Sequence, residues 1–515
     1  QLCLISTALG QGAADFTSTA LQFSMTNPGG SARTIGLGGT ATALGGDITA
    51  ASSNPAGLGF FNRSEFSFST QFNALNSSSL YLGSRTDESK LNFNIPNLGA
   101  VIHKGSNRGK WRGGSFGFSV NRVVDFHNTA RYEGLNTESD FIRYSIFQDN
   151  VIGPNDLTDL AFNTFLTDEF FQIYDGGETV FIDGVEVNVA DFFGNNLQAG
   201  DSLFFVDRNI FDAVSGEPAT PGEDFPVIQD EIIETRGAIY KASFSYGANY
   251  NDQLYLGASL GLLSVNKEVE RTYTERPTEA DLDNLILTDI FDITGGGVVG
   301  TFGVIARPVT PLLIGLSYTT PTYYFLEQTR ELSLTANYIG FSPETDGILF
   351  TPFDYSITTP SSLKAGLTGF FGKNGFITAE VERINYGGAN LSRPSDGVSF
   401  TEFNNTIDRS FESTFNYRVG AEYRFDIFRL RAGYSYIDDP VEDELDQSIT
   451  EVSFGGGVRT NKFYFDIGVA TGSLADNSVS PYPDTPIGST GNIAAPTASI
   501  TNDNTRVSLT FGILF

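Results

Sequence analysis

Residues 505–515 read TRVSLTFGILF, and this short stretch contains the pattern that decides the fold. Apolar side chains occupy every second position, namely Val507, Leu509, Phe511, Ile513 and Phe515. The small or polar residues Ser508, Thr510 and Gly512 stand between the first four of them. Because successive side chains of a β-strand point to opposite faces, a period of two predicts a strand with one apolar and one polar face.

The same alternation recurs along most of the chain, for example at 240–247, 254–262, 415–426 and 463–469. A membrane β-barrel needs strands of about ten residues with one apolar face. In lipid every backbone polar group must be hydrogen-bonded within the protein. A closed sheet is the only β-structure that meets this requirement. A large soluble β-protein is the alternative. Aromatic faces opposite Gly, Ser and charges such as Arg418 and Glu422 make it the weaker interpretation.

Counting these runs predicts about fourteen strands. They lie near 64–82, 89–104, 114–127, 236–250, 254–274, 296–308, 312–335, 354–371, 375–388, 410–426, 428–438, 449–460, 462–474 and 505–515. Connections after even-numbered strands are short. Those after odd-numbered strands, the first excepted, are long, at roughly 129–235, 275–295, 336–353, 389–409, 439–448 and 475–504. Short periplasmic turns and long outer loops are typical of outer-membrane barrels.

We therefore predict an all-β fold, a 14-stranded antiparallel transmembrane β-barrel over residues 63–515, in the bacterial outer membrane. The last strand ends in Phe515 at the carboxyl terminus, which resembles the insertion signal of such barrels. No apolar run of 18 residues occurs, so no transmembrane helix is expected.

Composition excludes several classes of function. The 515 residues contain one Cys and two His, so we expect no disulfide framework, no metal site and no His-based catalytic set. We predict neither an enzyme nor a cofactor. A net charge of −30 argues against nucleic-acid binding. The acidic excess is concentrated at 223–234, 281–292 and 438–446, which we expect to be solvated outer loops; a Ca²⁺ ion bridging them is the alternative.

The N-terminal residues do not alternate. Residues 1–12 read like the remnant of a signal peptide or an N-terminal extension. Residues 13–62 are dense in Gly, Ala, Ser and Thr, with occasional large apolar side chains. A fourteen-stranded barrel is too wide for its own side chains to fill. We therefore predict that residues 13–62 form a plug, or hatch, in the lumen.

This segment resembles a known family. Residues 36–47, GLGGTATALGGD, followed by SNPAGL at 53–58, resemble the hatch of the FadL/TodX-type outer-membrane transporters of hydrophobic compounds. The sequence of residues 31–69 most resembles the Bacteroidetes branch of this family. The resemblance implies a porin-like barrel that takes up hydrophobic compounds, such as long-chain fatty acids, passively and under control of the plug.

The resemblance also implies a gate at Asn54, Pro55, Ala56 and Gly57, beside an inward kink of the third strand. From the residues alone, Pro55 fixes its φ and pushes Asn54 out of the helical region, and Gly57 permits a positive φ. A rigid corner between plug and barrel is the alternative interpretation. In the third strand, the alternation falters at Arg122–Val123, which favours a bulge.

Residues 129–235 form a long insertion, which we expect to cap the extracellular mouth. The spacing predicts one amphipathic helix over 156–174, and Asp183-Gly184 predicts a hairpin turn between 180–182 and 185–187. Candidate ligand-binding residues are Phe162 and Phe165 in the cap and Phe23, Met25 and Leu37 in the plug. The cap aromatics could instead form the cap's own core.

The expected partners are the lipid bilayer and a hydrophobic small molecule, detergent or lipid. The alternative function is of another class, a structural or accessory barrel subunit of a larger outer-membrane secretion or barrel-assembly complex. Its partners would then be other outer-membrane proteins, and the insertion would be the docking surface.

Overall fold

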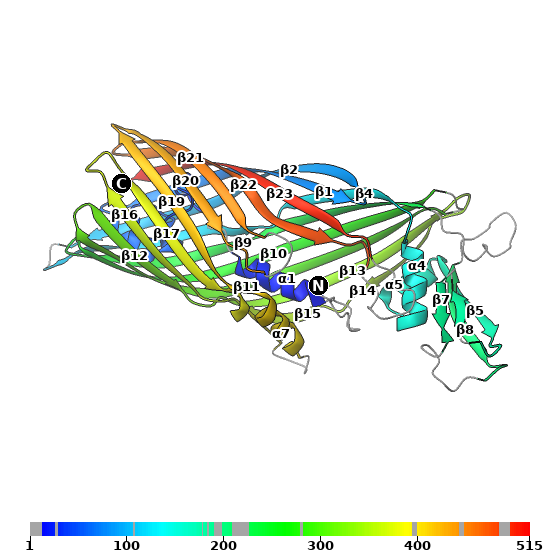
Figure 1. The fold of residues 1–515 in the computed structure, drawn as a ribbon. Helices are drawn as coiled ribbons and strands as arrows, with labels where there is room; N and C mark the ends of the chain where they lie inside the picture. Colours follow the sequence, from blue (N-terminus) through cyan, green and yellow to red (C-terminus); the bar gives the residue numbers. More distant parts are fainter. Residues whose placement is uncertain are drawn as a thin grey trace.

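A computed structural model describes residues 13–25, 29–106, 109–177, 179–182, 185–189, 198–208, 226–278, 282–393, 399–441, 447–483 and 495–515. The predicted signal remnant, residues 1–12, lies outside the described residues. The chain forms a closed barrel of tilted strands, with the C-terminus at one end and the long insertion at the other (Figure 1).

Fourteen segments make up the wall, and β1 pairs with β23 to close it. In chain order they are β1 (Glu65–Tyr81), β2 (Ser84–Gly105), β3 (Trp111–Asp125) with β4 (Asn128–Asn136), β9 (Val227–Tyr250), β10 (Leu254–Pro277), β11 (Leu282–Val309), β12 (Leu312–Thr319) with β13 (Tyr323–Tyr338), β15 (Phe353–Thr358) with β16 (Ser362–Phe370), β17 (Gly375–Asn385) with β18 (Asn390–Ser392), β19 (Ser413–Phe425), β20 (Phe428–Ile437), β21 (Ile449–Arg459), β22 (Phe463–Val479) and β23 (Ala498–Leu514). All pairings between them are antiparallel. The predicted number of strands and their order along the chain are confirmed, although β9 and β11 are longer than predicted.

The two faces of the wall differ in chemistry. Exposed side chains of the strands are mostly large and apolar, such as Phe66, Phe244, Leu430 and Phe511. The opposite face buries Ser, Thr and charged groups, among them Ser69, Ser245 and Arg418. An apolar exterior around a polar interior is the arrangement of a membrane-spanning barrel. None of the described helices has the length and apolar content needed to cross a membrane.

One predicted loop is wrong. Residues 275–295 were expected to be an outer loop, but β10 and β11 stay paired as far as Glu275 and Leu285. The acidic run 281–292 therefore lies largely within β11 rather than in a loop. Its Asp residues obscured the continuing alternation, since Leu285, Leu287 and Ile293 are buried. The acidic run 223–234 likewise continues into β9 from Val227 onward.

The insertion has a core of its own. It contains α4 (Phe141–Phe147), η2 (Gln148–Ile152), α5 (Asp156–Asn163), β5 (Thr167–Ile173), β6 (Thr179–Ile182), β7 (Val185–Asn188) and β8 (Ser202–Arg208). The helix predicted over 156–174 is too long, because the chain turns at Phe165 (φ 60°) and enters β5. The predicted hairpin is confirmed by the pairing of β6 with β7. Residues 183–184 themselves lie outside the described part of the chain.

The insertion packs over the outer ends of the longest strands. Phe141 and Leu160 belong to one buried cluster with Tyr273, Leu285 and Leu334 of β10, β11 and β13. This cluster also holds Tyr482, which follows β22. The insertion therefore extends from the outer ends of β10, β11 and β13 to the loop that follows β22.

The remaining elements belong to the N-terminal segment and the outer loops. The N-terminal segment holds α1 (Ala13–Ser24), α2 (Ala32–Ile35), α3 (Ala50–Ser53) and η1 (Pro55–Phe60). The outer loops carry β14 (Glu344–Leu349), η3 (Tyr386–Gly388) and α7 (Thr401–Ser410).

Candidate functional site

The N-terminal segment lies against strands from many parts of the wall, and inward-facing glycines allow this close approach. A Cβ on Gly303 of β11 would overlap Asn54 Oδ1, and one on Gly315 of β12 would overlap the carbonyl oxygen of Thr42. A Cβ on Gly433 of β20 would overlap the backbone of Gly38. The wall therefore needs glycine at these inner positions, which explains part of the glycine excess in the sequence.

Buried charges hold the segment on the side of β17 and β19. Glu380 accepts hydrogen bonds from the backbone N–H groups of Ala41 (3.1 Å) and Thr42 (2.9 Å). Glu380 also pairs with Arg418 (3.2 Å), whose side chain is 1% exposed. Arg33 of α2 pairs with Glu422 (3.4 Å) in the same way. A buried ion pair is stable only when its partners stay in place, so these contacts fix this part of the segment.

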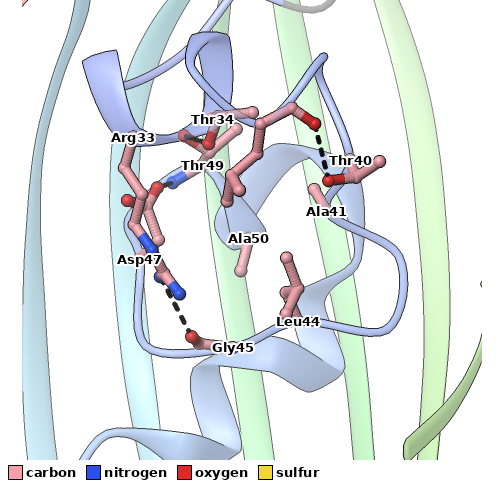
Figure 2. A pocket seen from close by; sticks show the side chains of 10 residues that line it. Arg33, Thr34, Thr40, Ala41, Leu44, Gly45, Asp47, Thr49 and Ala50 are labelled. Carbon is pink, nitrogen blue, oxygen red and sulfur yellow. Dashed lines mark hydrogen bonds between the residues drawn. The ribbon is translucent and has the colours of Figure 1, made fainter. Parts of the chain in front are cut away.

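A small cavity lies within the segment itself, lined by Arg33, Leu37, Leu44 and Asp47 among others (Figure 2). Its volume of about 10 Å³ has room for about one water molecule. Arg33 Nη1 donates to the carbonyl oxygen of Gly45 across it (3.3 Å). This cavity is too small for an organic ligand.

The four predicted gate residues form a tightly packed corner. Asn54 Nδ2 donates to the carbonyl oxygens of Thr42 (2.6 Å) and Leu316 (3.3 Å), and Asn54 Oδ1 accepts from the N–H of Ala56 (3.2 Å). Pro55 opens η1. Gly57 does not adopt the predicted positive φ, but a Cβ there would lie 2.8 Å from both Ala50 Cβ and the Leu44 carbonyl oxygen. The corner thus needs glycine for space. Its role as a gate stays a prediction.

The third strand breaks where the sequence indicated a bulge. The register between β3 and β9 shifts between Arg122 and Val124, which confirms the predicted irregularity. β2 pairs with β3 only as far as Asn97 and Asn121. Beyond this point β4 pairs with β9 alone among the described strands.

β4 packs against the hairpin formed by β1 and β2, and among the described strands it has no ladder with either of them. Tyr132 of β4 packs on Tyr81 of β1 with their ring centroids 4.4 Å apart, and both side chains are buried. Asp125 stands at the break and accepts hydrogen bonds from Asn73 Nδ2 (2.5 Å) and the N–H of His127 (3.1 Å). It also pairs with Arg122. The wall between the second and third strands is therefore a polar seam that lacks a continuous ladder.

A large apolar cluster surrounds α1. Phe23 meets Tyr324 and Phe126 with centroid distances of 5.2 and 6.0 Å, and Met25 packs against the same cluster. Lys267 Nζ donates to Gln22 Oε1 (2.8 Å) and lies 5.5 Å from the Phe126 ring. These contacts place an apolar cluster beside the break in the third strand.

The other predicted ligand residues lie elsewhere. Leu37 belongs to a separate cluster with Leu44 and Phe376. Phe162 and Phe165 lie in the insertion and are 42% and 53% exposed, so they do not form its core. The five predicted ligand residues therefore do not form one site: Phe23 and Met25 share a cluster, Phe162 and Phe165 lie together at the end of α5, and Leu37 lies apart from both pairs.

Sequence reasoning missed several aromatic residues of the cluster around α1. These are Phe16, Phe126, Tyr324, Phe353, Tyr355, Phe400 and Phe403. Two signals were available: Phe16 and Phe23 are seven residues apart on one helix, and Phe400, Phe403 and Ile407 have helical spacing. No local pattern predicts that these two helices meet.

Comparison with known proteins supports the fold. No protein-family model matches the chain, and no curated protein matches it. The chain is similar to the crystal structure of a Pseudomonas aeruginosa FadL homologue, with a TM-score of 0.52 and 12% identity over 95% of this chain and 99% of that one. It is also similar to the Ralstonia pickettii toluene transporter TbuX, with a TM-score of 0.50 and 13% identity over the same shares. At such identities the likeness shows a shared barrel fold.

Proposed function

We propose that the protein is an outer-membrane channel for the passive uptake of hydrophobic compounds, such as long-chain fatty acids, controlled by its N-terminal segment. One observation carries the proposal. An apolar, aromatic cluster around α1 lies in a barrel whose inner wall also buries many Ser, Thr and charged side chains, and it reaches Phe126 at the break in the third strand. The fold shared with a FadL homologue and a toluene transporter supports it.

The proposed route has three stages. An apolar ligand first contacts the exposed rings of Phe162 and Phe165 on the insertion. It then enters the cluster at Phe23 and Met25 by displacing α1. It leaves sideways through the polar seam at the third strand. Gating requires part of residues 13–62 to act as a plug that shifts, with Asn54–Gly57 at its base and Leu37 in the part that is held by charge.

Uptake of a labelled long-chain fatty acid by host cells that lack their own uptake route tests the proposal. Cells that make the protein should accumulate the label faster than cells that do not. A labelled sugar of similar mass is the control, because an unplugged pore would admit both. Equal fatty-acid uptake with and without the protein would overturn the proposal.

A second function, an accessory subunit of a larger outer-membrane complex, is favoured by one observation. The insertion leaves apolar rings exposed, namely Phe162, Phe165 and Phe204, the last 69% exposed. Exposed apolar groups that gather on one part of a protein are typical of interaction surfaces. Purification in mild detergent separates the two functions: a co-migrating chain in equal amount would favour the subunit, and a single chain that supports uptake would favour the channel.

A further inference from the structure

The wall has a second break, almost opposite the first in the ring of fourteen strands. β17 pairs with β19 from Gly375–Tyr423 to Asn385–Ser413, and the ladder ends there. β17 then gives way to η3 and β18, and β18 pairs with β15 alone among the described strands. β17 has 11 residues, which is the length needed to cross the hydrocarbon core. The second break therefore lies where β17 leaves the hydrocarbon core on the extracellular side of the membrane.

A helix closes this break in place of a strand. Asn404 of α7 accepts a hydrogen bond from the N–H of Leu391 (2.8 Å) and donates one to its carbonyl oxygen (2.9 Å). One carboxamide thus satisfies both backbone groups that a neighbouring strand would otherwise bind. At Leu391 the closure depends on a side chain rather than on a ladder.

An aromatic cage lies behind α7, and a ring of the N-terminal segment fills it. Phe16 of α1 has centroid distances of 5.8, 5.3, 5.4 and 5.5 Å to Phe353, Tyr355, Phe400 and Phe403. Phe403 lies on α7 and Phe400 directly precedes it. If α7 moves outward, half of the cage leaves with it and Phe16 is uncovered.

The same helix reaches the first break at its other end. Phe23 packs on Phe126, the residue that follows β3, and lies about 10 Å along the helix axis from Phe16. α1 therefore lies between the two breaks. A shift of the whole helix would therefore break aromatic contacts at both ends.

We propose that α7 is the door of a second side opening, through which apolar molecules enter the lumen from the outer leaflet, and that α1 couples this door to the break in the third strand. The proposal rests on the proposed uptake function. An aliphatic chain or a single ring has the chemistry to replace the Phe16 side chain in the cage. Exit through the third strand and entry beneath α7 then lie on opposite sides of one barrel.

The substitution Asn404→Ala tests the door, and Asn405→Ala is the matched control because Asn405 is exposed on the same helix. Asn404→Ala should speed hydrogen–deuterium exchange at the Leu391 amide by about tenfold, the factor expected for one lost hydrogen bond. It should also speed exchange in residues 128–130 of β4 and raise fatty-acid uptake. Asn405→Ala should change none of these.

The outcomes separate the door from the channel. If wild-type cells take up no fatty acid, the proposed function itself fails. If they do but Asn404→Ala speeds exchange without raising uptake, α7 is a fixed cover and the door is overturned. If exchange rises at Leu391 but not in β4, the coupling through α1 is overturned.

A covalent lock gives the opposite perturbation. Cysteines at positions 391 and 404, introduced by Leu391→Cys and Asn404→Cys in a Cys3→Ser background, lie where the two residues are already hydrogen-bonded. Oxidation to the disulfide, verified by mass spectrometry, should abolish most uptake, and reduction should restore it. Equal uptake by the oxidised and reduced forms would overturn the door.

Discussion

At the scale of single residues, Glu275 determines how the insertion is attached. It lies near the outer end of β10, a strand of 24 residues that extends far beyond the membrane. Its carboxylate accepts hydrogen bonds from the N–H of Phe141 (3.2 and 3.1 Å) and from Gln229 Nε2 (3.0 Å). Burial, together with the nearby charge of Asp140, raises the pKa of Glu275 to about 7.

This raised pKa predicts a pH dependence. Since the folded-state pKa lies above the usual value of 4.5, the stability that Glu275 contributes is fully present below about pH 4.5 and is lost as the pH rises through about 7. Exchange in α4 should therefore be slower at pH 5 than at pH 8, after correction for intrinsic rates. Glu275→Gln should flatten this difference, whereas Glu344→Gln, at an exposed position on β14, should preserve it. A wild-type profile without pH dependence would contradict the prediction.

We expect that replacing Arg418 causes a large loss of folding stability. It is almost fully buried and pairs with both Glu380 (3.2 Å) and Glu382 (2.9 Å). Arg418→Met leaves two carboxylates with reduced compensation, which should cost about 3–5 kcal/mol. Heat modification on gels measures this, with Arg85→Met as the control because the side chain of Arg85 is 70% exposed. Equal midpoints for the two variants would contradict the role of Arg418.

Sequence reasoning reached some of these residues and not others. Phe23, Met25 and Leu37 were predicted together as large apolar side chains of the plug, and the structure places the first two in one cluster. Leu37 is only twelve residues from Met25, yet it packs with Phe376 of another strand. Such contacts depend on how the segment folds within the barrel, and no periodic pattern records that.

At the scale of elements, the packing of η1 against the barrel wall depends on glycines of the wall strands. Gly303→Ala places a Cβ where Asn54 Oδ1 lies, while a Cβ on Gly369 of β16 meets no atom within 4 Å. Gly303→Ala should therefore weaken the bonds from Asn54 to Thr42 and Leu316 by about 1–3 kcal/mol. Faster exchange at Ala56 would show this, and Gly369→Ala should behave like wild type. Unchanged exchange in Gly303→Ala would mean that the corner adjusts without strain.

Strands were easier to predict than the elements between them. β19 and β23 face lipid on one side only, so apolar and polar side chains alternate along them. The sequence alone therefore distinguishes the two faces of each strand. β11 was predicted too short because Asp289 and Asp292 lie where the strand has left the membrane. There the rule of one apolar face no longer applies. α7 was missed since its ten residues follow a loop and its partners lie on α1, η3 and β18.

At the scale of the whole molecule, the insertion is attached at the tip of a hairpin. Asn136 of β4 and Val227 of β9 are direct partners, so the chain leaves and re-enters the wall at one point. Replacing residues 137–226 by a two-residue turn should leave the heat-modifiable barrel intact and lower the rate of uptake, because Phe162 and Phe165 are removed. Exchange should increase only in the outer ends of β10, β11 and β13, which lose their apolar cover. Loss of the folded barrel on gels would contradict this modular arrangement.

The net charge of −30 also has a clearer meaning for the whole molecule. Arg33, Arg418 and Arg431 face buried carboxylates inside the wall. Asp283 and Glu344, by contrast, lie on outer extensions of the strands. The similarity of the sequence of residues 31–69 to the Bacteroidetes branch of the family stays a prediction.

The unequal height of the wall has one further consequence. β9, β10 and β11 have 24, 24 and 28 residues, whereas β19, β20 and β21 have 13, 10 and 11. The rim is therefore oblique, and its low edge lies beside α7 (Figure 1). If α7 opens as proposed, a solute that diffuses in two dimensions along the cell surface would meet that entrance at its own level on this edge. The supply rate on that side should follow how strongly the solute partitions into the outer leaflet, rather than its concentration in the surrounding water.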